Sequence, residues 1–154
     1  MNLKFFKRLH ADPEFCAQLG QVTLAAGRFE SNLRAYLILR GVKVSERGAT
    51  FGTLIKKLKD NGLLSENGVQ VLRDLKEQRN YLTHCLFDLF SARVDETLLP
   101  RSDLVPMDVA LFTEKAWELE QNLSGLDRIV EKEIDRPKVL KPGTPIENQL
   151  LFRP

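Results

Sequence analysis

The stretch "ADPEFCAQLGQVTLAAGRFESNLRAYLILRG", residues 11 to 41, decides the fold because it predicts one long amphipathic helix. Asp12 is a natural N-cap, Pro13 suits the first helical position, and Gly41 is a typical C-terminal stop. Between these ends, apolar residues recur at steps of three and four, the period of a helix with one buried face. This stripe consists of Phe15, Leu19, Val22, Ala26, Phe29, Leu33 and Leu37. Such a helix must bury its stripe against other elements.

Three further segments show helical periodicity. "ATFGTLIKKLKDNG" predicts a short helix that ends at Asn61-Gly62. Ser65 caps a third helix that runs to about Phe90, and its apolar positions are Val69, Leu72, Leu75, Leu82 and Leu86. The last helix lies within "MDVALFTEKAWELEQNLSGLDRIVEKEI", with Trp117 expected to pack beside a stripe of Val109, Phe112, Ala116, Leu119, Leu123, Leu126 and Val130. We predict an all-α fold, an up-down bundle of four to five helices.

The sequence divides into a helical bundle over residues 1–134 and a proline-containing tail over residues 135–154. The tail carries prolines that preclude a continuing helix, yet it also holds Ile146, Leu150, Leu151 and Phe152. We expect it to lie outside the bundle core. Residues 91–106 contain two prolines and no helical period, and are expected to be irregular, extended or a short hairpin.

Composition limits the function. With 154 residues, 43% hydrophobic and 29% charged, the chain is large enough for one globular domain. A net charge of +2 means that any contact with nucleic acid must be local. Cys16 and Cys85 form no disulfide framework, and no signal or membrane segment is evident, so we expect a cytoplasmic protein. The sequence contains no zinc-ligand spacing and no phosphate-binding loop, so we expect no metal or cofactor.

One feature of the third helix is unusual for a simple core helix. Within "EQRNYLTH", residues 77 to 84, Arg79 falls among the leucines of the apolar stripe. A guanidinium buried without a partner would cost several kcal/mol, so Arg79 either meets a carboxylate or opens into a cleft where an anion can bind. In an α-helix, Asn80 and His84 share a face, whereas Arg79 and His84 differ by about 140° of rotation and about 7.5 Å of rise.

Two interpretations of these residues are open. In the structural one, Arg79 pairs with Glu30 or Glu118, and His84 is a satisfied core or interface histidine. In the functional one, Arg79 and His84 flank a bound phosphate. A second semi-apolar face on this helix, carrying Asn80, His84 and Phe87, also indicates a homodimer with the helix near the twofold axis.

"RNYLTH" resembles the motif of the HEPN superfamily, in which an Arg, often followed by Asn, precedes a His by four to six residues. The helical context of residues 12 to 134 is also similar to that family. The resemblance implies a HEPN-like bundle and a dimeric, metal-independent endoribonuclease that cleaves RNA through attack by the 2′-OH. It also implies a role as a toxin or antiviral defence effector, with an antitoxin or defence-system protein as a possible partner.

The resemblance assigns roles to three residues. Arg79 would contact the scissile phosphate, Asn80 would orient it, and His84 would transfer protons. Leu86 stands where the branch silenced by nucleotide transfer has a Tyr, so the resemblance does not extend to that regulation. The alternatives are a non-catalytic HEPN-like module that binds a partner protein or nucleotide, and an unrelated helical adaptor.

Overall fold

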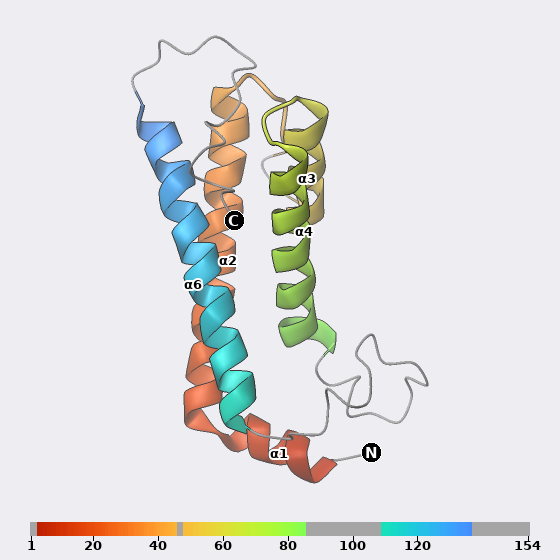
Figure 1. Ribbon diagram of the computed structural model, residues 1–154, viewed down its shortest axis with the longest axis vertical. Helices are drawn as coiled ribbons and strands as arrows, with labels where there is room; N and C mark the ends of the chain where they lie inside the picture. Colours follow the sequence, from red (N-terminus) through yellow and green to blue (C-terminus); the bar gives the residue numbers. More distant parts are fainter. Residues whose placement is uncertain (1–2, 46–47, 86–108, 137–154) are drawn as a thin grey trace.

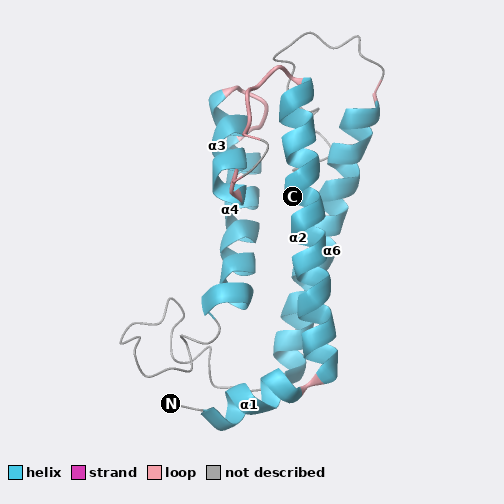
Figure 2. Cartoon of the chain, turned by 180° about the vertical axis from the view of Figure 1, so that it is seen from behind, coloured by secondary structure: helices cyan, strands magenta, loops and turns pink. Residues whose placement is uncertain are grey.

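The computed structural model describes residues 3–45, 48–85 and 109–136, and every regular element in this part is helical (Figures 1 and 2). The elements are α1 (Leu3–Ala11), α2 (Pro13–Leu39), α3 (Phe51–Asp60), α4 (Glu66–Asn80), a π-helical turn η1 (Tyr81–Cys85) and α6 (Val109–Asp135). The all-α prediction is therefore confirmed. The predictions for residues 91–106 and for the tail from residue 137 onward fall outside the described residues.

The helix α2 forms for the reasons that its sequence predicts. The Asp12 carboxylate accepts a hydrogen bond from the Phe15 amide over 2.7 Å, which satisfies one of the free N–H groups of the first turn. Gly41 follows the helix with φ +76°, a left-handed conformation that glycine adopts without strain. The buried residues are Phe15, Val22, Ala26, Phe29, Leu33, Tyr36 and Leu37.

The pair α3 and α4 is set by two capping residues and one tight turn. Thr50 caps α3 through the Thr53 amide at 3.2 Å, and Ser65 caps α4 through the Gly68 amide at 3.1 Å. Gly62 turns the chain between them with φ +64°. The third helix, predicted to be one α-helix up to about Phe90, instead changes to a π-helical turn at Tyr81.

The long helices α2 and α6 lie side by side along the length of the molecule (Figure 1). The two run in the same direction, because Phe112 near the start of α6 packs on Phe5 of α1, beside the start of α2, whereas Asp127 meets Asn32 further along. The helix α4 runs the opposite way (Figure 1). The long helices α2, α4 and α6 therefore alternate in direction along the chain (Figure 1).

Two features of the bundle differ from the sequence analysis. The helix α1 was not predicted, because only Phe5 and Leu9 of its short sequence are buried, at 2% and 1% exposure, and both depend on contacts with other helices. Trp117 was expected to pack but is 52% exposed, because the buried face of α6 is formed by Ala116, Leu119, Leu123, Asp127 and Val130. Within the described ranges, none of the helices combines the length and apolar composition needed to cross a bilayer.

The packing of α2 predicts a sharp contrast between two leucines of this helix. Leu33 is 1% exposed, whereas Leu24 is 75% exposed. We expect Leu33→Ala to lower the free energy of unfolding by about 2–5 kcal/mol, because it leaves a cavity in the core. Leu24→Ala should change it by no more than about 0.5 kcal/mol. Urea unfolding of both variants measures this, and equal effects would contradict the assigned core.

Candidate functional site

The predicted site residues lie where α4 changes from an α-helix to a π-helical turn. Arg79 and Asn80 end the α-helical part, and His84 lies in the π turn, Tyr81–Cys85. The Thr83 hydroxyl donates to the Arg79 carbonyl oxygen over 2.8 Å at this transition. Single π turns inside helices occur frequently at functional sites, because they displace side chains from the regular helical positions. The sequence pattern alone did not indicate this turn.

Arg79 is held by an ion pair across the bundle. Its Nη2 donates to Oε1 of Glu30 on α2 over 2.7 Å, and the two side chains are 20% and 21% exposed. The guanidinium carbon also lies 5.8 Å from the ring centroid of Phe51 on α3, within the range of a cation–π contact. Arg79 therefore links α4 to both α2 and α3. Of the two ion-pair partners considered from the sequence, Glu30 is confirmed and Glu118 instead pairs with Lys115.

The Glu30 carboxylate is in an unfavourable position for a charge. Burial raises its pKa above the usual 4.5, and the attraction of the nearby Arg79 and Arg34 only partly offsets this effect. The Nε of Arg79 is buried and has no hydrogen-bond partner in the described part of the chain. The ion pair is thus incompletely satisfied on the side of Arg79. Such a site retains capacity for a further hydrogen-bonding group.

Asn80 and His84 differ in their exposure to solvent. Asn80 is half-buried and His84 is exposed. The π turn winds less per residue than an α-helix, so the angle between Arg79 and His84 is smaller than the roughly 140° expected for an α-helix. Arg79 is thus held in an ion pair, whereas His84 is exposed to solvent.

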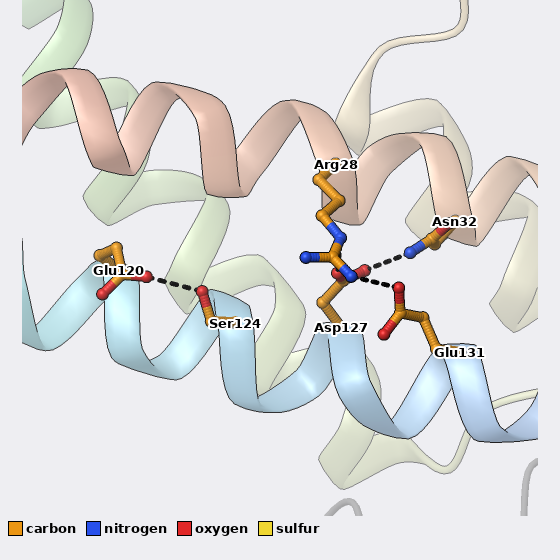
Figure 3. Close-up of polar contacts among 6 residues, drawn as sticks. All are labelled: Arg28, Asn32, Glu120, Ser124, Asp127 and Glu131. Carbon is orange, nitrogen blue, oxygen red and sulfur yellow. Dashed lines mark hydrogen bonds and ion pairs between the residues drawn. The ribbon is translucent and has the colours of Figure 1, made fainter.

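A second polar cluster lies between α2 and α6, away from the motif (Figure 3). Asp127, with a side chain only 4% exposed, meets the Arg28 Nε at 2.9 Å and accepts from the Asn32 side chain at 2.7 Å. Arg28 also pairs with Glu131. Burial raises the pKa of Asp127 above 3.8, and its polar neighbours partly counter this. The sequence missed this cluster, although Asp127 lies four residues after Leu123 on the apolar stripe.

The Asp127 cluster has a structural function. All its polar groups pair with one another across the two long helices, and a buried polar contact of this kind favours one alignment of the helices over others. In the described part of the chain, no group of three or more His, Cys, Asp or Glu side chains could hold a metal ion. The candidate site predicted from the sequence is the region of Arg79, Asn80 and His84.

Comparison with known proteins does not assign the chain. No protein-family model, no curated protein and no solved structure matches it.

The buried position of Glu30 predicts an unusual pH dependence of stability. Because the folded state binds this proton more tightly than the unfolded chain, Glu30 contributes stability below about pH 4.5 that is lost as pH rises through the folded pKa. We expect Glu30→Gln to remove this decline, so that its free energy of unfolding falls less than that of the wild type as pH rises above 4.5. Denaturant unfolding at a series of pH values measures this. Parallel curves for the two proteins would show that burial of Glu30 has no such effect.

Proposed function

We propose that this protein is a metal-independent endoribonuclease of the HEPN type, with a site formed by Arg79, Asn80 and His84. The observation that carries the proposal is the exposed His84 on a π turn that directly follows Arg79 and Asn80. Exposure is what a proton-transferring group needs, because the group must reach a substrate that enters from solvent. A regular α-helix with a sealed histidine would have favoured the structural interpretation instead.

The proposed chemistry uses the 2′-OH of RNA as the nucleophile. A histidine accepts the 2′-OH proton while the 2′ oxygen forms a bond to phosphorus. The bond from phosphorus to the 5′ oxygen breaks, and that oxygen receives a proton from an imidazolium. The products are a 2′,3′-cyclic phosphate and a 5′-OH end. His84 is suited to this work because imidazole gains and loses protons near neutral pH.

Arg79 and Asn80 would stabilise the charge that develops on the phosphate. A guanidinium carries five N–H donors, and the hydrogen bond between Arg79 Nη2 and Glu30 uses one of them. Arg79 can therefore keep its contact with Glu30 while another edge binds a phosphate oxygen. Glu30 then acts as a positioning residue that fixes the direction of the guanidinium, and Asn80 contributes a neutral hydrogen bond.

A specific observation also favours a second candidate, a non-catalytic helical module. The Arg79–Glu30 ion pair, with Phe51 beside it, is sufficient to explain Arg79 as a structural residue that joins three helices. In that case the exposed His84 would contact a partner protein or nucleotide. The two functions differ in what they predict for single-residue variants, so one set of experiments separates them.

The ribonuclease proposal predicts cleavage of single-stranded RNA in the presence of EDTA, with 2′,3′-cyclic phosphate ends, while DNA of the same sequence survives. His84→Ala should lower the rate by at least about 10²- to 10⁴-fold, the usual contribution of proton transfer. Arg79→Ala should have a similar effect, and Asn80→Ala a smaller one, because a neutral hydrogen bond contributes less than a charged one. Gel analysis of end-labelled RNA measures these rates.

The control variant for this experiment is Gln78→Ala, an exposed residue on the same helix, which should leave the rate unchanged. Cleavage that persists in His84→Ala, or that requires magnesium, would mean a contaminant or another mechanism. The absence of cleavage of any RNA by the wild type, together with large losses of stability in both Arg79→Ala and Glu30→Ala, would support the non-catalytic module.

We further propose a homodimer in which α4 lies near the twofold axis, so that two copies of the site share one cleft. On α4, the exposed Arg73 lies seven residues before Asn80 and therefore on the same face, while Leu24, Ile38 and Leu39 of α2 are exposed apolar side chains. We expect twice the mass of one chain in solution at micromolar concentration. Arg73→Asp should weaken this dimer and Leu24→Asp should not, as measured by sedimentation. A monomeric wild type would contradict the proposal, and the opposite response of the two variants would place the interface on α2.

A further inference from the structure

The helix α1 carries a basic surface that the proposed activity does not yet explain. Lys4, Lys7 and Arg8 lie at spacings of three and four, so they share one side of the helix, and all three are exposed. The helix contains no acidic residue. Within the described part of the chain, none of the three basic side chains forms an ion pair, whereas Arg28, Lys56, Arg79 and Lys115 each do.

Helix stability accounts for only part of this charge, because Arg8 lies in the last turn of α1, where a positive charge is favourable. Lys4 lies in the first turn of α1, where a positive charge opposes the helix dipole, and that turn contains no acidic residue. The opposite side of the helix, formed by Phe5 and Leu9, is 2% and 1% exposed and provides the contacts that hold α1 in place. The basic residues are therefore free to serve another function.

Packing connects α1 to the candidate site. Phe5, Leu9 and Phe15 form a small apolar cluster, and Tyr81 of the π turn packs against it. Phe112 of α6 lies 5.6 Å from Phe5, measured between ring centroids, and fixes the helix from the other side. As a result, α1 crosses the end of the bundle towards which α4 and the π turn point (Figures 1 and 2). The basic surface and His84 thus lie at the same end of the molecule.

We propose that Lys4, Lys7 and Arg8 form a binding surface for the phosphate backbone of single-stranded RNA and guide the strand to His84. This inference rests on the proposed ribonuclease function and adds the residues that bind the substrate. Cationic side chains on one helix face match a line of phosphates, and such contacts bind without reading sequence. With a net charge of +2 for the whole chain, a local surface of this kind is what RNA binding requires.

The burial of Phe5 and Leu9 distinguishes RNA from a membrane as the binding partner. A basic amphipathic helix that binds a lipid surface must insert its apolar side between the lipids. In α1 that side already packs against Phe15, Tyr81 and Phe112, so only the charged side is available. A surface that offers charge without apolar side chains fits a solvated phosphate backbone better than a bilayer.

The test measures binding separately from cleavage. Every protein carries His84→Ala to prevent cleavage, and binding to a fluorescent 20-nucleotide RNA is measured between about 50 and 200 mM salt. The triple variant Lys4→Gln, Lys7→Gln, Arg8→Gln should bind at least about tenfold more weakly at low salt. The slope of its log affinity against log salt should also be shallower by about 2, because each phosphate contact on a single strand contributes about 0.7 to the slope. The matched control is Lys59→Gln, Arg128→Gln, Lys132→Gln, which removes the same charge from exposed positions away from α1. It should bind as the parent does.

Three results would overturn the inference. Equal binding by the α1 variant and its parent would show that RNA binds elsewhere. If the protein that keeps His84 still cleaves RNA in that case, the ribonuclease proposal remains intact. Equal losses in the α1 variant and the control would show that only net charge matters. Binding to phosphatidylserine vesicles but not to RNA would assign α1 to a membrane surface. Circular dichroism confirms the fold of each variant, and the single variant Lys7→Gln, expected to show a smaller loss of the same kind, serves if the triple variant does not fold.

Discussion

Burial of the apolar stripe of α2 is the interaction that organises the bundle. Its seven buried residues extend along the whole helix, and α1, α3, the π turn and α6 all contact this helix. Burial of one large apolar side chain stabilises a fold by about 1.5–3 kcal/mol, so no other helix in the described part could replace this contribution. The position of each remaining helix follows from how it covers the stripe: α6 along its length, α3 at Phe29 through Phe51, and α1 at its start.

Polar groups at the edges of this apolar core determine how the helices are aligned. Apolar packing tolerates a shift of one helix along another, whereas buried charges do not, because an unpaired buried charge costs several kcal/mol. Asp127 with Arg28 and Asn32 aligns α6 on α2, and Arg79 with Glu30 aligns α4 on α2. The polar groups of the Asp127 cluster pair with one another and align the two helices. The Arg79–Glu30 pair leaves the buried Nε of Arg79 without a hydrogen-bond partner in the described part of the chain, and this difference separates a structural cluster from a candidate site.

The position of the candidate site at one end of α4 has a physical consequence for substrate binding. A site in the middle of the bundle would be covered by neighbouring helices, whereas the end of α4 is bordered by the short helix α1. The few apolar contacts that hold α1 lie on its inner side, at Phe5 and Leu9. Its outer side is therefore free to carry charge. The same end of the molecule therefore combines a group suited to proton transfer with cations suited to phosphate binding.

The sequence by itself determined the helices and most of the core. The caps at Asp12 and Ser65, the glycine stops at Gly41 and Gly62, and the apolar periods of α2, α3, α4 and α6 are local properties, so they could be identified without knowledge of the fold. The anomaly of Arg79 was also visible, since a charged residue on an apolar stripe needs a partner, and Glu30 was one of the two partners considered. What remained undetermined was the choice between those two.

Only the tertiary structure decided the features that depend on contacts between distant segments. The parallel arrangement of α2 and α6, the exposure of Trp117 and the pairing of Asp127 all result from which helix faces meet. The helix α1, with nine residues, is too short to be evident from periodicity, and it is stabilised by Phe15, Tyr81 and Phe112 from other elements. The π turn likewise depends on its surroundings, because Tyr81 packs into that cluster while Arg79 is held by Glu30. A sequence pattern reports the local conformational preference of one segment. These features instead arise from the free energy of contacts between segments far apart in the chain.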